Sequence, residues 1–221
     1  MTADRDTTRR TPLLAAVLTF AVLTVSYVVV NRSTPHPDAS GAEVLRHART
    51  HASTVELGAF LLFASAVPLA LAAAVLHRRL RALGSAGPGA AITLVGGAVA
   101  ASALTGSAMF AWSGGRLPEN AGSALARTLA DLSFLSGGPL YAVMFALLVA
   151  GVSLAGLLPR ALTGIGLALA AVGMVSTLTL LSDGFGYLLP VVRFGGLIWL
   201  VFAAALLPRT GRPDASDASD A

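Results

Sequence analysis

The chain has 221 residues, of which 55% are hydrophobic and only 12% are charged. Soluble domains carry about 25% charged residues, so this chain has too few charges to cover a water-facing surface. Its formal net charge is +4, but the arginines are scattered without interleaved aromatic residues, which argues against a nucleic-acid partner. Because the sequence contains no cysteine, disulfides and thiol chemistry are excluded.

Six apolar runs are long enough to cross a bilayer as helices. We therefore predict an all-α, polytopic membrane protein built as a single bundle of six transmembrane helices. The predicted spans are residues 13–30, 57–76, 89–112, 132–158, 161–181 and 188–207. Around them we expect a short N-terminal segment over 1–12, an outer loop over 31–56 and a disordered polar tail over 208–221.

The first run follows several arginines, as the core of a signal peptide does. It ends at Tyr27 and three valines instead of small residues, so we predict an uncleaved helix. Six spans put both termini on one side, which carries nine arginines against six on the other. Arg78, Arg79 and Arg81 share one short loop of that side, so the positive-inside rule predicts cytoplasmic termini.

The pattern F-x-S-x-x-P-L occurs in the second span at residues 63–69 and in the fourth at 134–140. This similarity has two equal explanations. One is a duplicated two-helix unit, and the other is chance similarity in a chain rich in Ala, Leu and Gly. The prolines remove helix hydrogen bonds, and the glycines admit a close neighbour. We expect Ser65 and Ser136 to help satisfy the freed backbone groups. The predicted helix-bend positions are Pro68, Gly137, Gly138 and Pro139.

Small residues spaced four apart predict where helices approach one another closely. Such pairs are Gly97/Ala101, Ser102/Gly106 and Gly166/Ala170. Helix packing is therefore our first interpretation of the bends as well, ahead of a ligand cavity at the bend.

Four charged residues flank the predicted outer ends of the spans and form a predicted outer polar cluster: Glu56, Asp131, Asp183 and Arg193. Arg193 lies inside an apolar run, so it must reach the interface or find a carboxylate, with Asp131 the first candidate and Glu56 the second. Asp131, in the expected first turn of its span, also suits the helix dipole. Two readings stay open, namely a structural clamp between helices and an outward-facing pocket for a polar ligand or ion.

Ser40 and Glu43 fit a capping box at the start of a short helix over residues 40–54. On that helix Glu43, His47 and His51 are spaced four apart and share one face, which is a possible set of metal ligands. Neighbouring Arg46 and Arg49 would oppose a cation, so we predict solvated polar residues and no bound metal. No catalytic, cofactor or phosphate-binding motif stands out, and we expect no cofactor.

The segments 61–73, 77–84, 131–139, 176–181 and 188–200 resemble small six-span membrane proteins of actinobacteria whose function is unknown. The resemblance covers the second to sixth spans. It implies the architecture and the bacterial plasma membrane, and it carries no functional residues.

The sequence therefore predicts a non-enzymatic structural or regulatory membrane component, in contact with the lipid bilayer and with other membrane subunits or copies of itself. The alternative is a small-molecule transporter or ligand-binding membrane protein that uses the outer polar cluster. A membrane enzyme using Glu43, His47 and His51 is the third hypothesis.

Overall fold

The computed structural model describes residues 3–208, with side chains from Pro12 onward except that of Asp183. This part of the chain is all helical, and six of its helical segments are long and apolar enough to cross a membrane, as predicted. The protein is thus a multi-pass membrane protein. The six spans are Pro12–Val30, Ala52–Ala82, Gly89–Gly115, Ser123–Leu154, Arg160–Leu180 and Gly184–Leu206.

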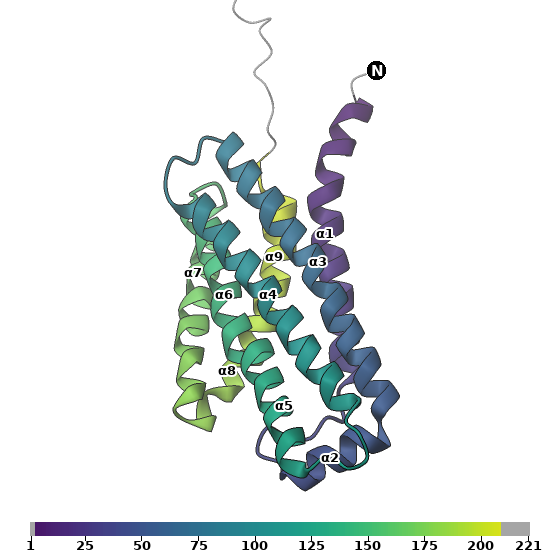
Figure 1. Cartoon of the computed structure of the whole chain (residues 1–221). Helices are drawn as coiled ribbons and strands as arrows, with labels where there is room; N and C mark the ends of the chain where they lie inside the picture. Colours follow the sequence, from purple (N-terminus) through teal and green to yellow (C-terminus); the bar gives the residue numbers. More distant parts are fainter. Residues whose placement is uncertain (1–2, 209–221) are drawn as a thin grey trace, which may run out of the picture.

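The centre of the bundle consists of α3 (Ala52–Ala82), α4 (Gly89–Gly115) and α6 (Tyr141–Leu154). Outside this centre, α1 (Ala3–Val30) packs on α3, and α7 (Arg160–Val175) packs on α6. The last helix, α9 (Gly196–Leu206), contacts α1, α6 and α7 (Figure 1). The start of α1 and the end of α9 lie at the same end of the bundle.

Close packing in the centre depends on small residues. A Cβ added at Gly96 would lie 2.5 Å from the backbone nitrogen of Leu148, and one at Gly151 would lie 2.5 Å from that of Thr93. Gly97 faces Ala73 just as tightly, so α4 uses glycine toward both α3 and α6. Gly166 also meets a neighbour, Trp199 of α9, whereas Gly106 has only the Ser136 hydroxyl within 4 Å, at 3.9 Å. The predicted small-residue contacts therefore exist at Gly97 and Gly166 but not at Gly106.

The other end of the bundle carries the amphipathic helix α2 (Gly41–Thr50). Ser40 is its N-cap, as predicted, and accepts a 3.2 Å hydrogen bond from the backbone N–H of Glu43. The helix ends at Thr50, earlier than expected, because the backbone changes direction at its C-cap, His51, and continues as α3. We call residues 31–51 the α2 cap.

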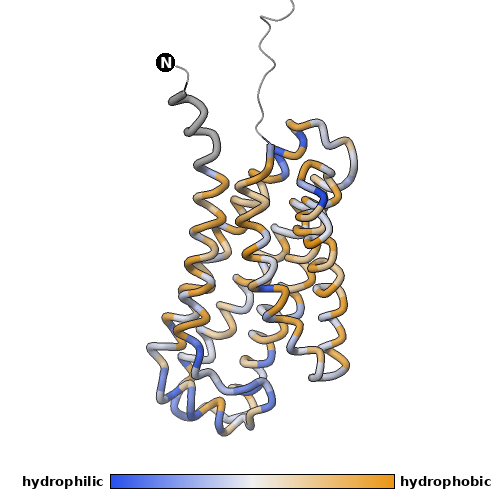
Figure 2. The backbone as a smooth tube through the Cα atoms, turned by 180° about the vertical axis from the view of Figure 1, so that it is seen from behind, coloured by the Kyte–Doolittle hydropathy of each residue, from blue (hydrophilic) through white to orange (hydrophobic). Residues whose placement is uncertain are grey.

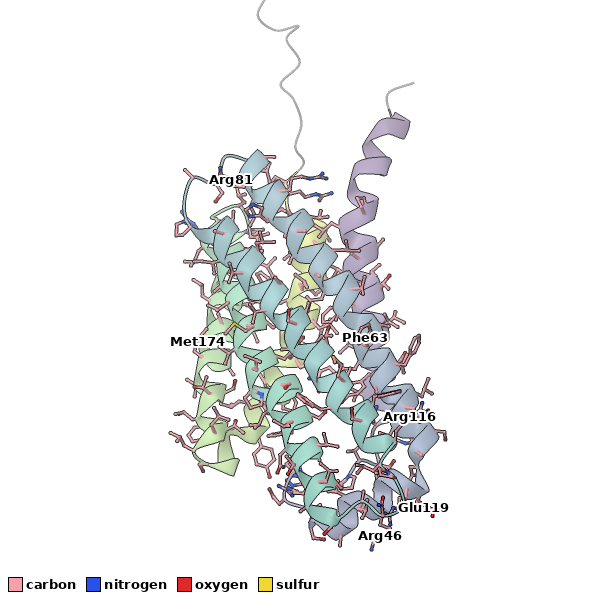
Figure 3. The ribbon with its side chains drawn as sticks, viewed as in Figure 1. Arg46, Phe63, Arg81, Arg116, Glu119 and Met174 are labelled. Carbon is pink, nitrogen blue, oxygen red and sulfur yellow. The ribbon has the colours of Figure 1, made fainter. Side chains whose placement is uncertain are left out.

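The α2 cap packs on α5 (Ser123–Leu135). Polar residues concentrate at this end, whereas the bundle is apolar along its length (Figure 2). Figure 3 shows Arg46, Arg116 and Glu119 here and Arg81 at the opposite end.

The fourth span departs most from the sequence-based prediction. It begins at Ser123, well before residue 132, and ends at Leu154, where Gly156 turns the chain with φ +71°. Within it, the π-helical segment η1 (Ser136–Leu140) connects α5 to α6. The sixth span has the same construction: α8 (Leu188–Pro190) passes into the π-helical η4 (Val191–Gly195) and then into α9.

The two matching proline sites differ in structure. Pro139 lies inside η1, whereas Pro68 sits within the uninterrupted helix α3. The Ser65 hydroxyl donates to the carbonyl of Leu62 at 2.7 Å, so it does not serve the carbonyl of Ala64 that Pro68 leaves free. The expected role of Ser65 is therefore wrong, because a serine in a helix reaches the carbonyls of the preceding turn.

Candidate functional site: a cavity beneath the α2 cap

A cavity with a volume of about 550 Å³ lies beneath the α2 cap. Its lining runs from exposed residues of the loop before α2, among them Arg32 and His36, to the buried Tyr141 and Ala142 of α6. The volume lies within the range of roughly 300–1,000 Å³ that is usual for small-molecule sites. Asp131, Arg193, Gly137 and Gly138 all line it.

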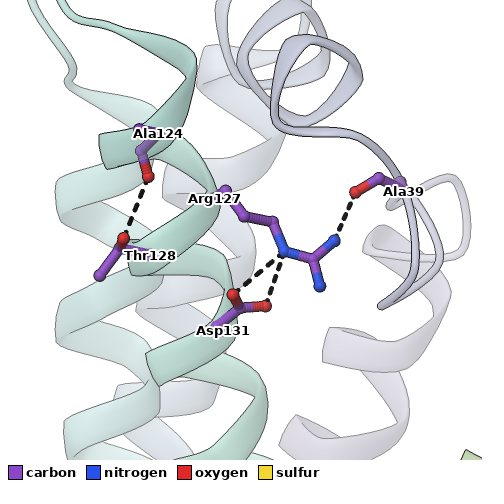
Figure 4. A network of polar contacts seen from close by, with 5 residues as sticks. All are labelled: Ala39, Ala124, Arg127, Thr128 and Asp131. Atoms are coloured by element: carbon purple, nitrogen blue, oxygen red, sulfur yellow. Dashed lines mark hydrogen bonds and ion pairs between the residues drawn. The ribbon is translucent and has the colours of Figure 1, made fainter.

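Arg127 connects α5 to the α2 cap (Figure 4). Its Nε lies 2.9 Å from Oδ1 and 3.0 Å from Oδ2 of Asp131, one helical turn further along α5. Its Nη1 donates to the carbonyl oxygen of Ala39. Both side chains are about half exposed or less, and the pair lines the cavity. The carboxylate of Asp131 is thus already neutralised.

Arg193 in η4 has a different environment from the predicted one. Its Nη2 donates to the carbonyl oxygen of Gly137 in η1, so the two π-helical segments are joined directly. Its guanidinium carbon lies 5.1 Å from the ring centroid of Tyr141, in a cation–π contact. No carboxylate with a described side chain lies within 4.0 Å of it.

The expected ion pair of Arg193 with Asp131 or Glu56 is therefore wrong for the described residues. Asp131 pairs with Arg127, which the helix places next to it at the i,i+4 spacing. Glu56 faces away from the cavity and reaches Arg116 at 4.0 Å, beside Trp112. The fourth member of the outer polar cluster, Asp183, has a side chain outside the described residues.

Asp131 and Arg193 also lie deeper in their spans than the sequence indicated. Asp131 follows Ser123, the first residue of its span, by eight positions, so the helix dipole of the first turn does not explain it. Arg193 follows Gly184 by nine positions in a span of 23 residues. A charge at the bilayer centre costs roughly 2.5–3.5 kcal/mol unless it is solvated or paired, and the cost falls toward the interface.

Tyr141 marks the deep wall of the cavity. Only 1% of its surface is exposed, yet its hydroxyl has no hydrogen-bond partner among the described residues. A buried hydroxyl without a partner costs about 1–3 kcal/mol, so a ligand that reached this group with an acceptor would remove that cost. It stacks on Phe145 at 5.3 Å between ring centroids, which fixes the ring in place.

Two serines close the cavity wall between α4 and α5. The Ser107 hydroxyl donates to the carbonyl of Ser133 at 2.8 Å, and that of Ser133 donates to the carbonyl of Ser107 at 3.0 Å. A Cβ added at Gly137 would collide with Ser107. This reciprocal pair holds α5 against α4 immediately before the π-helical turn.

The histidine motif does not form a metal site in the described structure. The rings of His47 and His51 stack on each other with centroids 4.7 Å apart, and Glu43 is exposed. No three His, Cys, Asp or Glu side chains gather among the residues described. Burial, and next the charge of His51, lower the pKa of His47 below its ordinary value of 6.5.

Sequence reasoning missed three residues of the cavity: Arg127, Tyr141 and Ser107. Arg127 precedes Asp131 by four residues, which is a readable signal once α5 is known to begin at Ser123. Tyr141 gives no signal, because it lies in an apolar run where an aromatic residue is ordinary. Of the predicted bend positions, Gly137 and Gly138 belong to the cavity, and Pro68 does not.

The chain matches no protein-family model, and neither a curated protein nor a solved structure shows significant similarity to it.

Proposed function

We propose that this membrane protein binds a small molecule in the cavity beneath the α2 cap, as a transporter or receptor does. The observation that carries the proposal is a pair of polar groups in one cavity: the Tyr141 hydroxyl, which has no partner among the described residues, and the Arg193 guanidinium, which donates to the Gly137 carbonyl but pairs with no described carboxylate. A charged residue inside a membrane span is a candidate for a functional site.

We also propose that both termini are cytoplasmic, in a bacterial plasma membrane, so that the cavity opens to the outside. The support is the positive-inside rule: Arg78, Arg79 and Arg81 follow one another at the end opposite the α2 cap. Exposed residues of the loop before α2 form part of the lining of the cavity.

Filling the cavity tests the binding proposal. Ala111 lines the cavity and is only partly buried, so Ala111→Phe occupies the space without disturbing the tight α4 contacts. Val95→Phe on the lipid-facing side of the same helix, where Val95 is 57% exposed, is the matched control.

The measurement is the thermal unfolding of the three purified proteins with mixtures of small metabolites. A ligand at about 100 times its Kd adds roughly 2.7 kcal/mol of stability. We expect at least one mixture to stabilise the native protein and the Val95→Phe variant but not Ala111→Phe. Equal responses of all three proteins to every mixture would exclude the cavity as a binding site.

A further inference from the structure

We propose that the ligand of this cavity is an amphiphile with one anionic head group, a carboxylate or a phosphate, on an apolar body. This inference rests on the proposed binding function and specifies the ligand class. The head group lies against Arg193 and Tyr141, and the body lies along the apolar wall.

The charge of the cavity favours an anion. Three arginines line it, Arg32, Arg127 and Arg193, against the single described carboxylate of Asp131. Arg127 and Asp131 form an ion pair at 2.9 Å, whereas Arg32 and Arg193 pair with no described carboxylate. A cationic ligand would find no free described carboxylate here, and an anion would relieve the cost of an unpaired guanidinium within a span.

The donors at the deep end fit an oxyanion. Among the described residues, Arg193 donates a hydrogen bond only from its Nη2, to the Gly137 carbonyl, so the other N–H groups of the guanidinium have no described acceptor. The planar guanidinium matches the two oxygens of a carboxylate or phosphate. Its contact with the Tyr141 ring holds it in place, and Tyr141, whose buried hydroxyl has no partner among the described residues, lines the same cavity.

The remaining wall fits an apolar body. Phe110, Phe134, Leu189 and Phe194 line the cavity from four different segments of the chain. An inorganic anion would leave this wall and most of the 550 Å³ unused. Burying the apolar body there removes its surface from water, which favours binding.

The test uses the full chain in nanodiscs of phosphatidylcholine, which has no net charge, with empty nanodiscs as the blank. Four radiolabelled probes share a twelve-carbon chain and differ in the head group: dodecanoate, dodecyl phosphate, dodecanol and dodecyltrimethylammonium. We expect saturable binding of one or both anions at least about tenfold tighter than that of dodecanol or the cation. A preference between the two anions identifies the head group as carboxylate or phosphate.

Variants assign the head group to its donors. Arg193→Gln and Tyr141→Phe should each weaken binding of the anion about tenfold or more, since each removes a hydrogen bond to a charged group. Arg193→Lys keeps the charge and loses the planar fork, so it should recover part of the affinity. Arg116→Gln is the matched control: it changes the net charge equally at the same end but lies outside the cavity. Tyr141→Phe breaks no described hydrogen bond, so its folding is not at risk.

Equal binding of dodecanoate, dodecyl phosphate and dodecanol would overturn the proposed ligand class. Equal losses in Arg193→Gln and Arg116→Gln would also overturn it. If Ala111→Phe abolishes binding of the neutral probe in that case, the binding function stands and only the anionic class fails. If Ala111→Phe changes the binding of no probe, the binding function itself fails.

Discussion

The glycines of η1 show how finely the cavity wall is fitted. Gly137 faces Ser107, whose Cβ lies 3.0 Å from the position of an added Cβ, whereas at Gly138 the nearest atom is a methyl of Leu189 at 3.4 Å. The two neighbours share one π-helical segment and differ in their surroundings alone. The serine pair between α4 and α5 leaves no room for a side chain at Gly137. At Gly138 the neighbour is the flexible side chain of Leu189.

We therefore expect Gly137→Ala to destabilise the protein by about 1–3 kcal/mol, as overpacking does. Gly138→Ala should be neutral or stabilise by up to about 1 kcal/mol, because alanine loses less conformational freedom than glycine in a helix. Thermal unfolding of the two purified variants in the same detergent measures the difference. If Gly137→Ala were as stable as Gly138→Ala, Ser107 and α4 would have to yield easily to a side chain at residue 137.

Among the elements, the α2 cap is held by few polar contacts, and Arg127 is central to them. It joins Ala39 of the cap to Asp131 of α5. Arg49 adds a 2.6 Å hydrogen bond from its Nη2 to the carbonyl of Glu119. The cap has only Ala48 as a fully buried residue of α2, so its apolar contribution is small.

Arg127→Gln should loosen the α2 cap while the spans stay folded. We expect faster hydrogen exchange of the backbone amides of residues 31–51, by roughly tenfold for a loss of about 1.4 kcal/mol. Arg46→Gln on the exposed face of α2 is the control and should leave the exchange rates unchanged. Similar rates in both variants would show that apolar packing on α5 holds the cap.

The same element should respond to acid. The pKa of His47 is lowered in the folded protein, so between its ordinary value of 6.5 and its folded value the unfolded or undocked cap binds more protons. The stability of the docked cap then rises with pH across this window and falls as the pH drops below 6.5. Exchange rates of the cap, corrected for the intrinsic pH dependence, should be higher at about pH 5 than at about pH 7. His47→Gln should abolish this difference; its persistence would assign the effect to another group.

The sequence predicts these elements unevenly. Apolar run length marks the six spans because lipid accepts only helices that satisfy their own backbone. The sequence does not reveal the start of α5, since Ser123–Leu132 mixes polar and apolar residues like a loop. Without that helix the Arg127–Asp131 ion pair cannot be predicted. The π-helical turns leave no periodic signal in segments that are apolar on all sides. The sequence predicts Asp131 and Arg193 in one cluster. Their hydrogen-bond and ion-pair partners, however, lie in α5 and η1, whose geometry the sequence does not predict.

For the whole molecule, orientation in the membrane decides which solution the cavity meets. The chain contains no cysteine, so single cysteines report accessibility without a background. Ser33 in the α2 cap and Ala86 in the loop between α3 and α4 are both exposed. They belong to opposite ends of the bundle.

We expect Ser33→Cys to react with a membrane-impermeant maleimide in intact cells and Ala86→Cys to react only after lysis. The reason is the placement of Arg78, Arg79 and Arg81 at the end near Ala86, which the positive-inside rule assigns to the cytoplasm. The native chain is the unlabelled control. The opposite labelling pattern would mean that the α2 end of the bundle, with its cavity, lies on the cytoplasmic side.

The π-helical segment η1 also bears on how the length of this chain can vary between related genes. A π-turn holds one residue more than an α-turn, so a chain that lacks one residue within Ser136–Leu140 can close the turn as ordinary α-helix and keep α5 and α6 in phase. The same loss in the middle of α4 would rotate every later residue by about 100° around the helix and turn its glycines away from α3 and α6. Single-residue gaps in an alignment of relatives should therefore collect at η1 and η4.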